Sequence, residues 1–186
     1  MLISTPNILT VSRILLTPLF VILLLKDMEG YALLIFTLAA ISDGLDGFIA
    51  RYTNQKTALG AYLDPLADKL LLSSAYICLA IMKIIPSWLA VLVITRDVII
   101  LIGISVFFMT GVSVNIKPSL VSKFTTVSQL STIFFSLLKP RFVHAYTLGW
   151  FLIWATATLT IISGLHYIYL GLTTLQNGLK NSHPKS

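Results

Sequence analysis

Hydrophobic residues along this chain gather in six long blocks, which short stretches containing polar residues, glycine or proline separate. A helix needs roughly 20 apolar residues to cross a bilayer, and each block approaches or reaches that length. We therefore predict an all-α integral membrane protein with six transmembrane helices in one bundle. The predicted helices cover Ile8–Leu25, Tyr31–Ala50, Leu66–Ile85, Leu89–Phe108, Phe124–Leu138 and Tyr146–Leu170.

The connections between the blocks are short. Gly30 lies in the first, Pro86 lies in the third and Gly111–Pro118 forms the fourth, and both residue types commonly mark such breaks. We expect the third helix to begin near Asp64, with Pro65 in its first turn, where a missing N–H does no harm. Little chain remains outside the blocks, so residues 1–186 are predicted to form a single membrane-embedded domain.

Composition supports the membrane assignment. Of 186 residues, 56% are hydrophobic and 11% are charged, whereas a soluble domain carries about 25% charged residues. The net charge is +6, but the basic residues are scattered among apolar segments. We therefore expect an anionic membrane surface and its lipids as partners, and no nucleic acid.

Four of the seven acidic residues lie at the junction of the second and third predicted helices. Asp43 and Asp46 stand three positions apart near the end of one helix, and Asp64 and Asp68 stand four positions apart near the start of the next. Each pair therefore shares one helical face. Acidic side chains at membrane depth are costly and are functional candidates by default. Two helices that face each other would bring all four carboxylates together.

Four clustered carboxylates require positive charge, and the nearby bases Arg51, Lys56 and Lys69 are too few to supply it. No Cys or His accompanies the cluster, so the oxygen ligands favour Mg²⁺ or Mn²⁺ over zinc. Four carboxylates suit two ions roughly 3.5–4 Å apart, an arrangement used for in-line displacement at phosphorus.

The segment around these aspartates resembles a known family. Asp43-Gly-Leu-Asp-Gly-Phe-Ile-Ala-Arg51, eight further residues and Gly60-Ala-Tyr-Leu-Asp-Pro-Leu-Ala-Asp68 are similar, at every fixed position, to the signature of the CDP-alcohol phosphatidyltransferases. The resemblance implies a six-helix membrane fold, a homodimer and a site that opens to the cytosol. It also implies transfer of a phosphatidyl group from CDP-diacylglycerol to an alcohol, with release of CMP.

The resemblance also implies roles for the aspartates. Asp43, Asp46 and Asp64 are expected to hold the metal ions, and Asp68 is expected to contact one as well. We assign Asp68 as the general base that takes the proton from the acceptor hydroxyl. A purely structural Asp68, as fourth member of the metal cage, is the alternative.

By the same resemblance, Gly47, Arg51 and Gly60 are expected to line the site for the nucleotide of CDP-diacylglycerol. Arg51 would pair with its phosphate or base. Alternatively, Arg51 extends its charged end to the lipid headgroups.

The phosphate of the acceptor requires a cation. Arg96 lies within the fourth predicted helix beside Asp97, and Lys123 opens the fifth. We assign Arg96 and Lys123 to an acceptor-phosphate site that faces the aspartates. The alternative is a structural Arg96–Asp97 pair with a headgroup-binding Lys123. Since adjacent helical residues point about 100° apart, we do not expect Arg96 and Asp97 to face each other.

Two further segments, Thr95–Ile99 and Lys117–Leu130, resemble the CDP-diacylglycerol-dependent cardiolipin synthases within the family. The related phosphatidylglycerophosphate synthases carry an Arg-Glu in the later half of the fourth helix and a second lysine in the fifth. In this chain the later half of the fourth predicted helix is the apolar Leu101–Phe108, without an Arg-Glu pair. The position of the second lysine is occupied by Thr125. Fewer cations suit the singly charged phosphodiester of phosphatidylglycerol better than a phosphomonoester. We therefore expect phosphatidylglycerol as acceptor, with glycerol 3-phosphate as the alternative.

A transporter is the alternative from another class, because intramembrane carboxylates can also hold a travelling divalent cation or proton. The chain shows no repeated halves and its acids cluster near one membrane face, which speaks against transport. No transit peptide precedes the first predicted helix, so we expect a bacterial inner membrane with the site facing the cytosol.

Overall fold

The computed structural model describes the backbone of residues 5–53, 58–110, 120–138 and 143–182. It describes the side chains of residues 11–42, 67, 69–103, 105, 120–138 and 148–174. In this part of the chain, all regular secondary structure is α-helical. Its helices are α1 (Thr5–Leu25), α2 (Glu29–Thr53), α3 (Ala58–Ile81), α4 (Ser87–Thr110), α5 (Leu120–Leu138) and α6 (Val143–Ser182).

The prediction of six helices in this order is confirmed for the described residues, but several boundaries differ. Gly30 was expected in a connection and instead lies in the first turn of α2. The expected start of the third helix near Asp64 was wrong, because α3 already begins at Ala58. Pro65 was interpreted as a residue of the first helical turn, whereas the helix already includes Ala58–Asp64 before it.

The ends of α1 and α3 share an unusual backbone conformation. Asp27 and Lys83, which follow these helices, have φ angles of 57° and 58°. After α3, the N–H of Ile84 donates to the carbonyl of Leu79 at 2.9 Å, the pattern of a helix terminus closed by a left-handed residue. Glycine usually occupies this position, and a lysine there holds a strained backbone.

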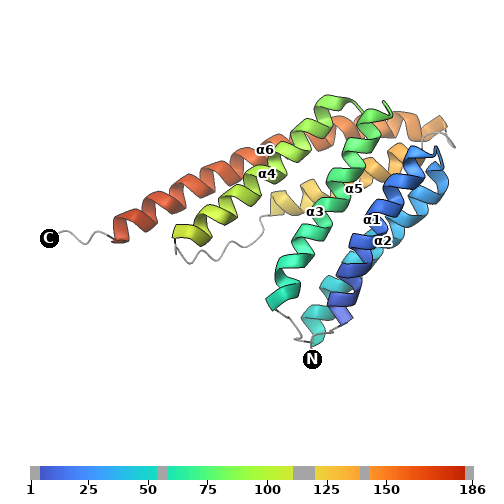
Figure 1. Ribbon diagram of the computed structural model, residues 1–186. Helices are drawn as coiled ribbons and strands as arrows, with labels where there is room; N and C mark the ends of the chain where they lie inside the picture. Colours follow the sequence, from blue (N-terminus) through green and yellow to red (C-terminus); the bar gives the residue numbers. More distant parts are fainter. Residues whose placement is uncertain (1–4, 54–57, 111–119, 139–142, 183–186) are drawn as a thin grey trace.

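The helices converge toward one end of the molecule (Figure 1). The α1–α2 and α3–α4 connections lie at that end, which we call the short-loop end, whereas the end of α2 and the start of α3 lie at the opposite end. Helix α1 packs against α2 and α3, α4 packs against α3 and α6, and α5 packs against α2, α3 and α6. The segments that carry the aspartates are thus far from the short-loop end.

The apolar core lies in the half of the bundle near the short-loop end. Phe20 of α1 and Phe36 of α2 are fully or almost fully buried there, with ring centroids 5.8 Å apart. Leu79 of α3, Leu89 of α4 and Ile133 of α5 are buried in the same cluster. Among the described side chains, this apolar core holds together the helices near the short-loop end.

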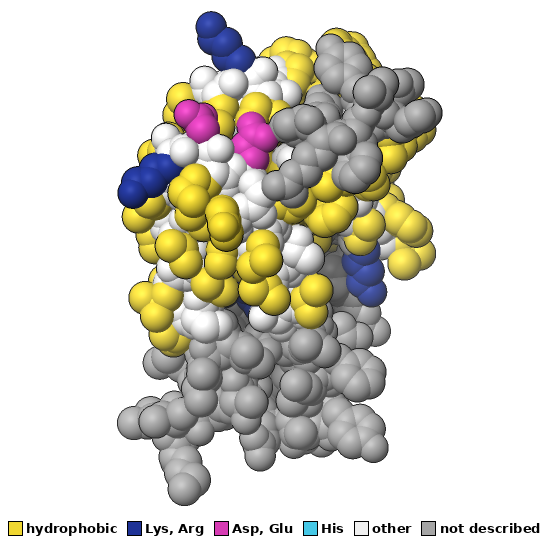
Figure 2. Space-filling view, turned by 90° about the vertical axis from the view of Figure 1, so that its right-hand side faces the viewer, with side chains coloured by type: hydrophobic (Ala, Val, Ile, Leu, Met, Phe, Trp, Pro, Cys, Tyr) yellow, Lys and Arg dark blue, Asp and Glu magenta, His cyan; other side chains and the backbone are white. Residues whose placement is uncertain are grey.

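Large apolar side chains also cover much of the outer surface. Figure 2 shows that hydrophobic residues dominate one face, with acidic and basic side chains near the short-loop end. Among the described residues, one helical stretch, Leu148–Thr174, is both long and apolar enough to cross a bilayer, with a mean hydropathy of 1.6. Each of the six helices has at least 19 residues, about 28 Å at 1.5 Å per residue and close to the thickness of a hydrocarbon layer.

Candidate active site

The four predicted metal-binding aspartates lie on two helices that share a neighbour. Asp43 and Asp46 belong to the C-terminal part of α2, Asp64 and Asp68 belong to the N-terminal part of α3, and α1 packs against both helices. Among the described side chains no three His, Cys, Asp or Glu residues come together. The predicted residues whose side chains lie outside the described part are Asp43, Asp46, Gly47, Arg51, Gly60, Asp64 and Asp68.

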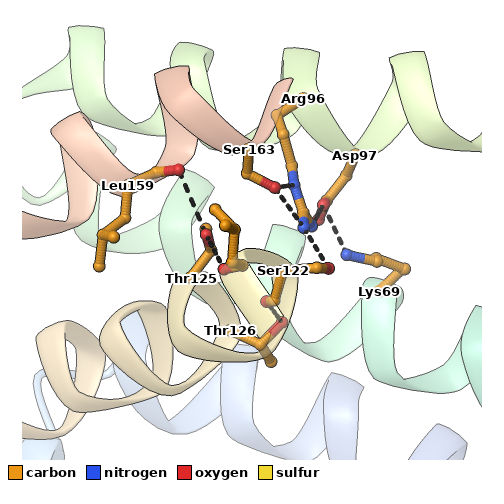
Figure 3. Close-up of polar contacts among 9 residues, drawn as sticks. Lys69, Arg96, Asp97, Ser122, Thr125, Thr126, Leu159 and Ser163 are labelled. Carbon is orange, nitrogen blue, oxygen red and sulfur yellow. Dashed lines mark hydrogen bonds and ion pairs between the residues drawn. The ribbon is translucent and has the colours of Figure 1, made fainter. Parts of the chain in front are cut away.

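A buried polar cluster lies in the middle of the bundle, and Arg96 is its centre (Figure 3). The side chains of both Arg96 and Asp97 are about 3% exposed. Arg96 Nη1 donates to Asp97 Oδ1 at 2.7 Å, and Lys69 Nζ of α3 reaches the same oxygen at 2.5 Å. We call Lys69, Arg96, Asp97 and their serine partners the Arg96 cluster.

Two serines complete the hydrogen bonds of the guanidinium. Arg96 Nη2 donates to Ser122 Oγ of α5 at 2.8 Å and to Ser163 Oγ of α6 at 3.1 Å, and Nε donates to Ser163 Oγ at 3.3 Å. The ring of Tyr167 lies 5.8 Å from the guanidinium carbon, within the range of a cation–π contact. Arg96 thus joins its own helix to α5 and α6 and, through Asp97, to α3.

The expectation that Arg96 and Asp97 would not face each other was wrong. Their Cβ atoms do leave the helix in different directions, but the arginine side chain is long enough for its guanidinium to return to the neighbouring carboxylate. The alternative of a structural Arg96–Asp97 pair therefore describes the geometry correctly. The pair is part of a larger set, because Lys69 shares the carboxylate.

Among the described side chains, the Arg96 cluster carries one more positive than negative charge, since Lys69 and Arg96 share one carboxylate. Within the same part of the chain, the second oxygen, Asp97 Oδ2, is buried and has no hydrogen-bond partner. A buried excess charge is costly unless something of opposite sign approaches it. The cluster therefore suits an anion near the helices that carry it.

Neither Lys69 nor Ser163 was predicted to belong to this cluster. Lys69 directly follows Asp68 on α3, and it was considered only as an insufficient counter-charge for the aspartates. Its amino group instead lies against α4. No sequence signal identified Ser163, because a serine in an apolar helix can satisfy its hydroxyl within its own helix.

Lys123 does not join the Arg96 cluster. Its side chain is exposed, whereas the preceding Ser122 points to Arg96. Adjacent positions on α5 thus face different surroundings. The pairing of Arg96 and Lys123 in one acceptor site stays a prediction.

A row of hydroxyl groups connects α5 to α6 beside the cluster. Thr156 Oγ1 lies 2.6 Å from Ser128 Oγ and 2.8 Å from Thr132 Oγ1, and Thr125 Oγ1 donates to the carbonyl of Leu159 at 3.2 Å. Small polar side chains allow close approach of helices in membranes and hydrogen-bond across them. This hydroxyl seam positions Ser122 and Ser163 around the guanidinium.

Comparison with known proteins gives a consistent picture. Residues 3–162 match the family model described as CDP-alcohol phosphatidyltransferase. The chain is 37% identical to a cardiolipin synthase (CMP-forming) of Rattus norvegicus, over 93% of this chain and 63% of that protein. It is 33% identical to a CDP-diacylglycerol–glycerol-3-phosphate 3-phosphatidyltransferase of Escherichia coli K12, over 89% of this chain and 93% of that protein. The chain thus spans less than two thirds of the rat protein and almost the full length of the bacterial one.

Proposed function

Because the chain belongs to the CDP-alcohol phosphatidyltransferase family, we propose that it transfers a phosphatidyl group from CDP-diacylglycerol to the hydroxyl of an anionic glycerol-type acceptor. CMP is the second product. The observation that carries the proposal is the complete signature from Asp43 to Asp68, which lies on two successive helices inside the matched region. Membership in a family of phosphatidyltransferases argues against the transporter alternative.

The proposed metal ligands are Asp43, Asp46, Asp64 and Asp68. A donor set of carboxylates without Cys or His fits hard cations, Mg²⁺ or Mn²⁺, and two ions balance the four negative charges. When bound, the ions withdraw charge from the attacked phosphorus and stabilise the departing CMP. The chain supplies the two helical faces that present these carboxylates.

Asp68 is the proposed general base. The acceptor oxygen loses its proton to the Asp68 carboxylate as it forms the new bond to phosphorus, and the bond between that phosphorus and the CMP oxygen breaks. Gly47, Arg51 and Gly60 are proposed to line the nucleotide site. Arg51 provides a donor pair for a phosphate there.

The acceptor phosphate is proposed to approach Arg96 and Lys123. The buried excess charge of the Arg96 cluster supports this proposal. So does the position of Lys69 on α3 immediately after Asp68, which connects the cluster in sequence to the proposed base. In this arrangement Arg96 orients Ser122 and supplies charge, and the exposed Lys123 contacts the phosphate directly.

Phosphatidylglycerol is the proposed acceptor, which makes cardiolipin the product. The name of the rat relative supports it. Thr125, where phosphatidylglycerophosphate synthases are expected to carry a second lysine, is fully buried in the hydroxyl seam. Glycerol 3-phosphate remains the alternative acceptor, favoured by the bacterial relative, which the chain matches along 93% of its length.

The cellular setting follows from the same reasoning. We propose that all six helices span the membrane, that the protein is a homodimer and that the aspartate end faces the cytosol of a bacterium, where the nucleotide-activated lipid is supplied. The helix lengths support the six spans.

One reconstitution tests the proposal. Purified protein receives CDP-diacylglycerol and Mg²⁺ or Mn²⁺, with phosphatidylglycerol in one tube and glycerol 3-phosphate in another, and the lipid products are identified by mass. We expect cardiolipin in the first tube. Phosphatidylglycerophosphate in the second tube alone would establish the alternative acceptor, and no CMP release in either tube would refute the proposed activity.

A further inference from the structure

A cleft of about 790 Å³ opens at the short-loop end, far from the segments that carry the aspartates. Five helices contribute to it: the start of α2, the end of α3, the start of α4, the end of α5 and α6. Its volume lies within the range of small-ligand sites, about 300–1,000 Å³. The lining residues are Glu29, Ala80, Lys83, Ile84, Ile85, Pro86, Ser87, Ser136, Trp150 and Ile153.

The cleft contains two charges of opposite sign that do not pair. Glu29 and Lys83 both line it, yet neither side chain forms an ion pair or a hydrogen bond within the described part of the chain. Figure 2 shows acidic and basic side chains at this end, above the hydrophobic surface. Two unpaired charges of opposite sign suit a ligand that carries both signs.

A buried hydroxyl also faces this cleft. Ser136 is about 1% exposed and lines the cleft, and its Oγ has no hydrogen-bond partner among the residues that the structure describes. A buried polar atom without a partner costs free energy, and a ligand oxygen can relieve it. Ser87, the first residue of α4, lies in the same lining, and the N–H groups of a first helical turn attract anions.

Exposed tryptophans gather at this end of the bundle. Trp150 lines the cleft and is 46% exposed, and the exposed rings of Trp88 and Trp154 pack against each other with centroids 5.5 Å apart. Tryptophan is enriched at the membrane–water interface. The molecules most available to the cleft are therefore the phospholipids of the surrounding bilayer.

We propose that the cleft binds the headgroup of a zwitterionic phospholipid that carries a primary ammonium. Lys83, Ser136 and the start of α4 bind its phosphate, and Glu29 accepts hydrogen bonds from its ammonium. A quaternary ammonium cannot donate hydrogen bonds, and the single tryptophan of the lining does not form an aromatic cage for one. The site is separate from the proposed transfer reaction, because it lies at the other end of the bundle.

The left-handed backbone of Lys83 fits this role. Its φ of 58° holds a conformation that a glycine would adopt without strain, so the position retains a lysine at a cost to stability. The strained residue is thus one of those that line the cleft.

Native mass spectrometry of the detergent-solubilised full chain tests the proposal. The protein is incubated without CDP-diacylglycerol or metal, with equal amounts of phosphatidylethanolamine, phosphatidylcholine or phosphatidic acid of identical acyl chains. We expect about tenfold greater retention of the ethanolamine lipid than of the other two, the value of one charge-assisted hydrogen bond. E29Q should abolish the preference for phosphatidylethanolamine over phosphatidic acid, whereas K83Q and S136A should weaken retention of all three lipids.

Matched controls come from the same end of the chain. D27N and K26Q remove one charge each at residues that do not line the cleft, and both should retain lipids as the unmodified protein does. Circular dichroism verifies that each variant keeps its helices. Three outcomes would each refute the headgroup site, whatever the transfer assay shows. The three lipids could be retained equally, the preference for phosphatidylethanolamine could survive E29Q, or the control variants could lose as much lipid retention as K83Q.

Discussion

The ammonium group of Lys69 and the carboxylate of Asp97 join α3 to α4, with 2.5 Å between Nζ and Oδ1. The partners lie 28 residues apart in sequence, and the contact brings the residue after Asp68 into the buried Arg96 cluster. A local change in the N-terminal half of α3 is therefore coupled through the Arg96 cluster to α4, α5 and α6.

Replacing Asp97 with Asn should destabilise the protein severely. The substitution leaves the charges of Arg96 and Lys69 without their shared carboxylate, and breaking a buried ion pair in this way costs about 3–5 kcal/mol. Thermal unfolding in detergent measures the effect. Lys69→Met is the comparison: since the lysine side chain is 20% exposed, its loss should lower the melting temperature less. Equal melting temperatures for D97N and the unmodified protein would contradict the role of this carboxylate.

Arg96→Lys should impair acceptor use while preserving the charge. A lysine cannot reproduce the separate bonds to Asp97, Ser122 and Ser163 that three guanidinium nitrogens make. We expect at least about a tenfold loss of kcat/KM for the acceptor, equal to one charged hydrogen bond, and little change in KM for CDP-diacylglycerol. Gly164→Ala is a matched control, because its added Cβ would lie 3.8 Å from the Arg96 side chain, an ordinary contact. Equal losses for both lipid substrates would argue against a role toward the acceptor.

Substitutions of the four aspartates should have two different effects, loss of metal binding or loss of the general base. D43N and D64N should abolish turnover through loss of metal, seen as loss of metal binding in calorimetry. D68N should stop transfer while the protein still binds CDP-diacylglycerol in the presence of metal, because a general base is required only as the acceptor attacks. Unchanged turnover of D68N would remove Asp68 as the base.

Thr125→Val tests how much the hydroxyl seam contributes to stability, separately from any role in the reaction. The fully buried hydroxyl donates to backbone carbonyls of α5 and α6, and its loss leaves an acceptor of α6 without this donor. We expect a loss of about 1 kcal/mol in the free energy of unfolding, with the ratio of phosphatidylglycerol to glycerol 3-phosphate use unchanged. A changed ratio would show that this position contacts the acceptor.

Lys83→Gly should stabilise the fold. Glycine relieves the left-handed strain of the residue that ends α3, worth about 1–2 kcal/mol. The same substitution at Asp27 should gain less, because aspartate tolerates this conformation better. Thermal unfolding of both variants measures the difference, and a destabilised K83G would show that the lysine side chain contributes more to the fold than its backbone costs.

The helices could be predicted from the sequence because each leaves a local signal in it. Six apolar blocks were sufficient to identify six helices, and Pro86 correctly marked the connection before α4. The start of α3 was predicted wrongly, because Pro65 was taken to mark the first helical turn, whereas a helix in a membrane can continue through a proline.

The contacts between helices were harder to predict from the sequence. The Arg96–Asp97 pair depends on the path of a long side chain, and the reach of Lys69 to Asp97 depends on how α3 and α4 pack. Neither can be read from helical periodicity, which fixes only the direction of each Cβ. The spacing of the four aspartates, by contrast, already predicted a cluster of carboxylates, and their resemblance to the family signature gave them roles that stay predictions.

The guanidinium of Arg96 bonds to side chains of α5 and α6 and, through Asp97, holds Lys69 of α3. If one of these helices tilted by itself, a buried donor would lose its acceptor at a cost of about 1–3 kcal/mol. Lateral pressure from the bilayer should therefore move α3, α4, α5 and α6 together as one rigid body. Any rearrangement that admits substrates should involve α1 and α2 instead.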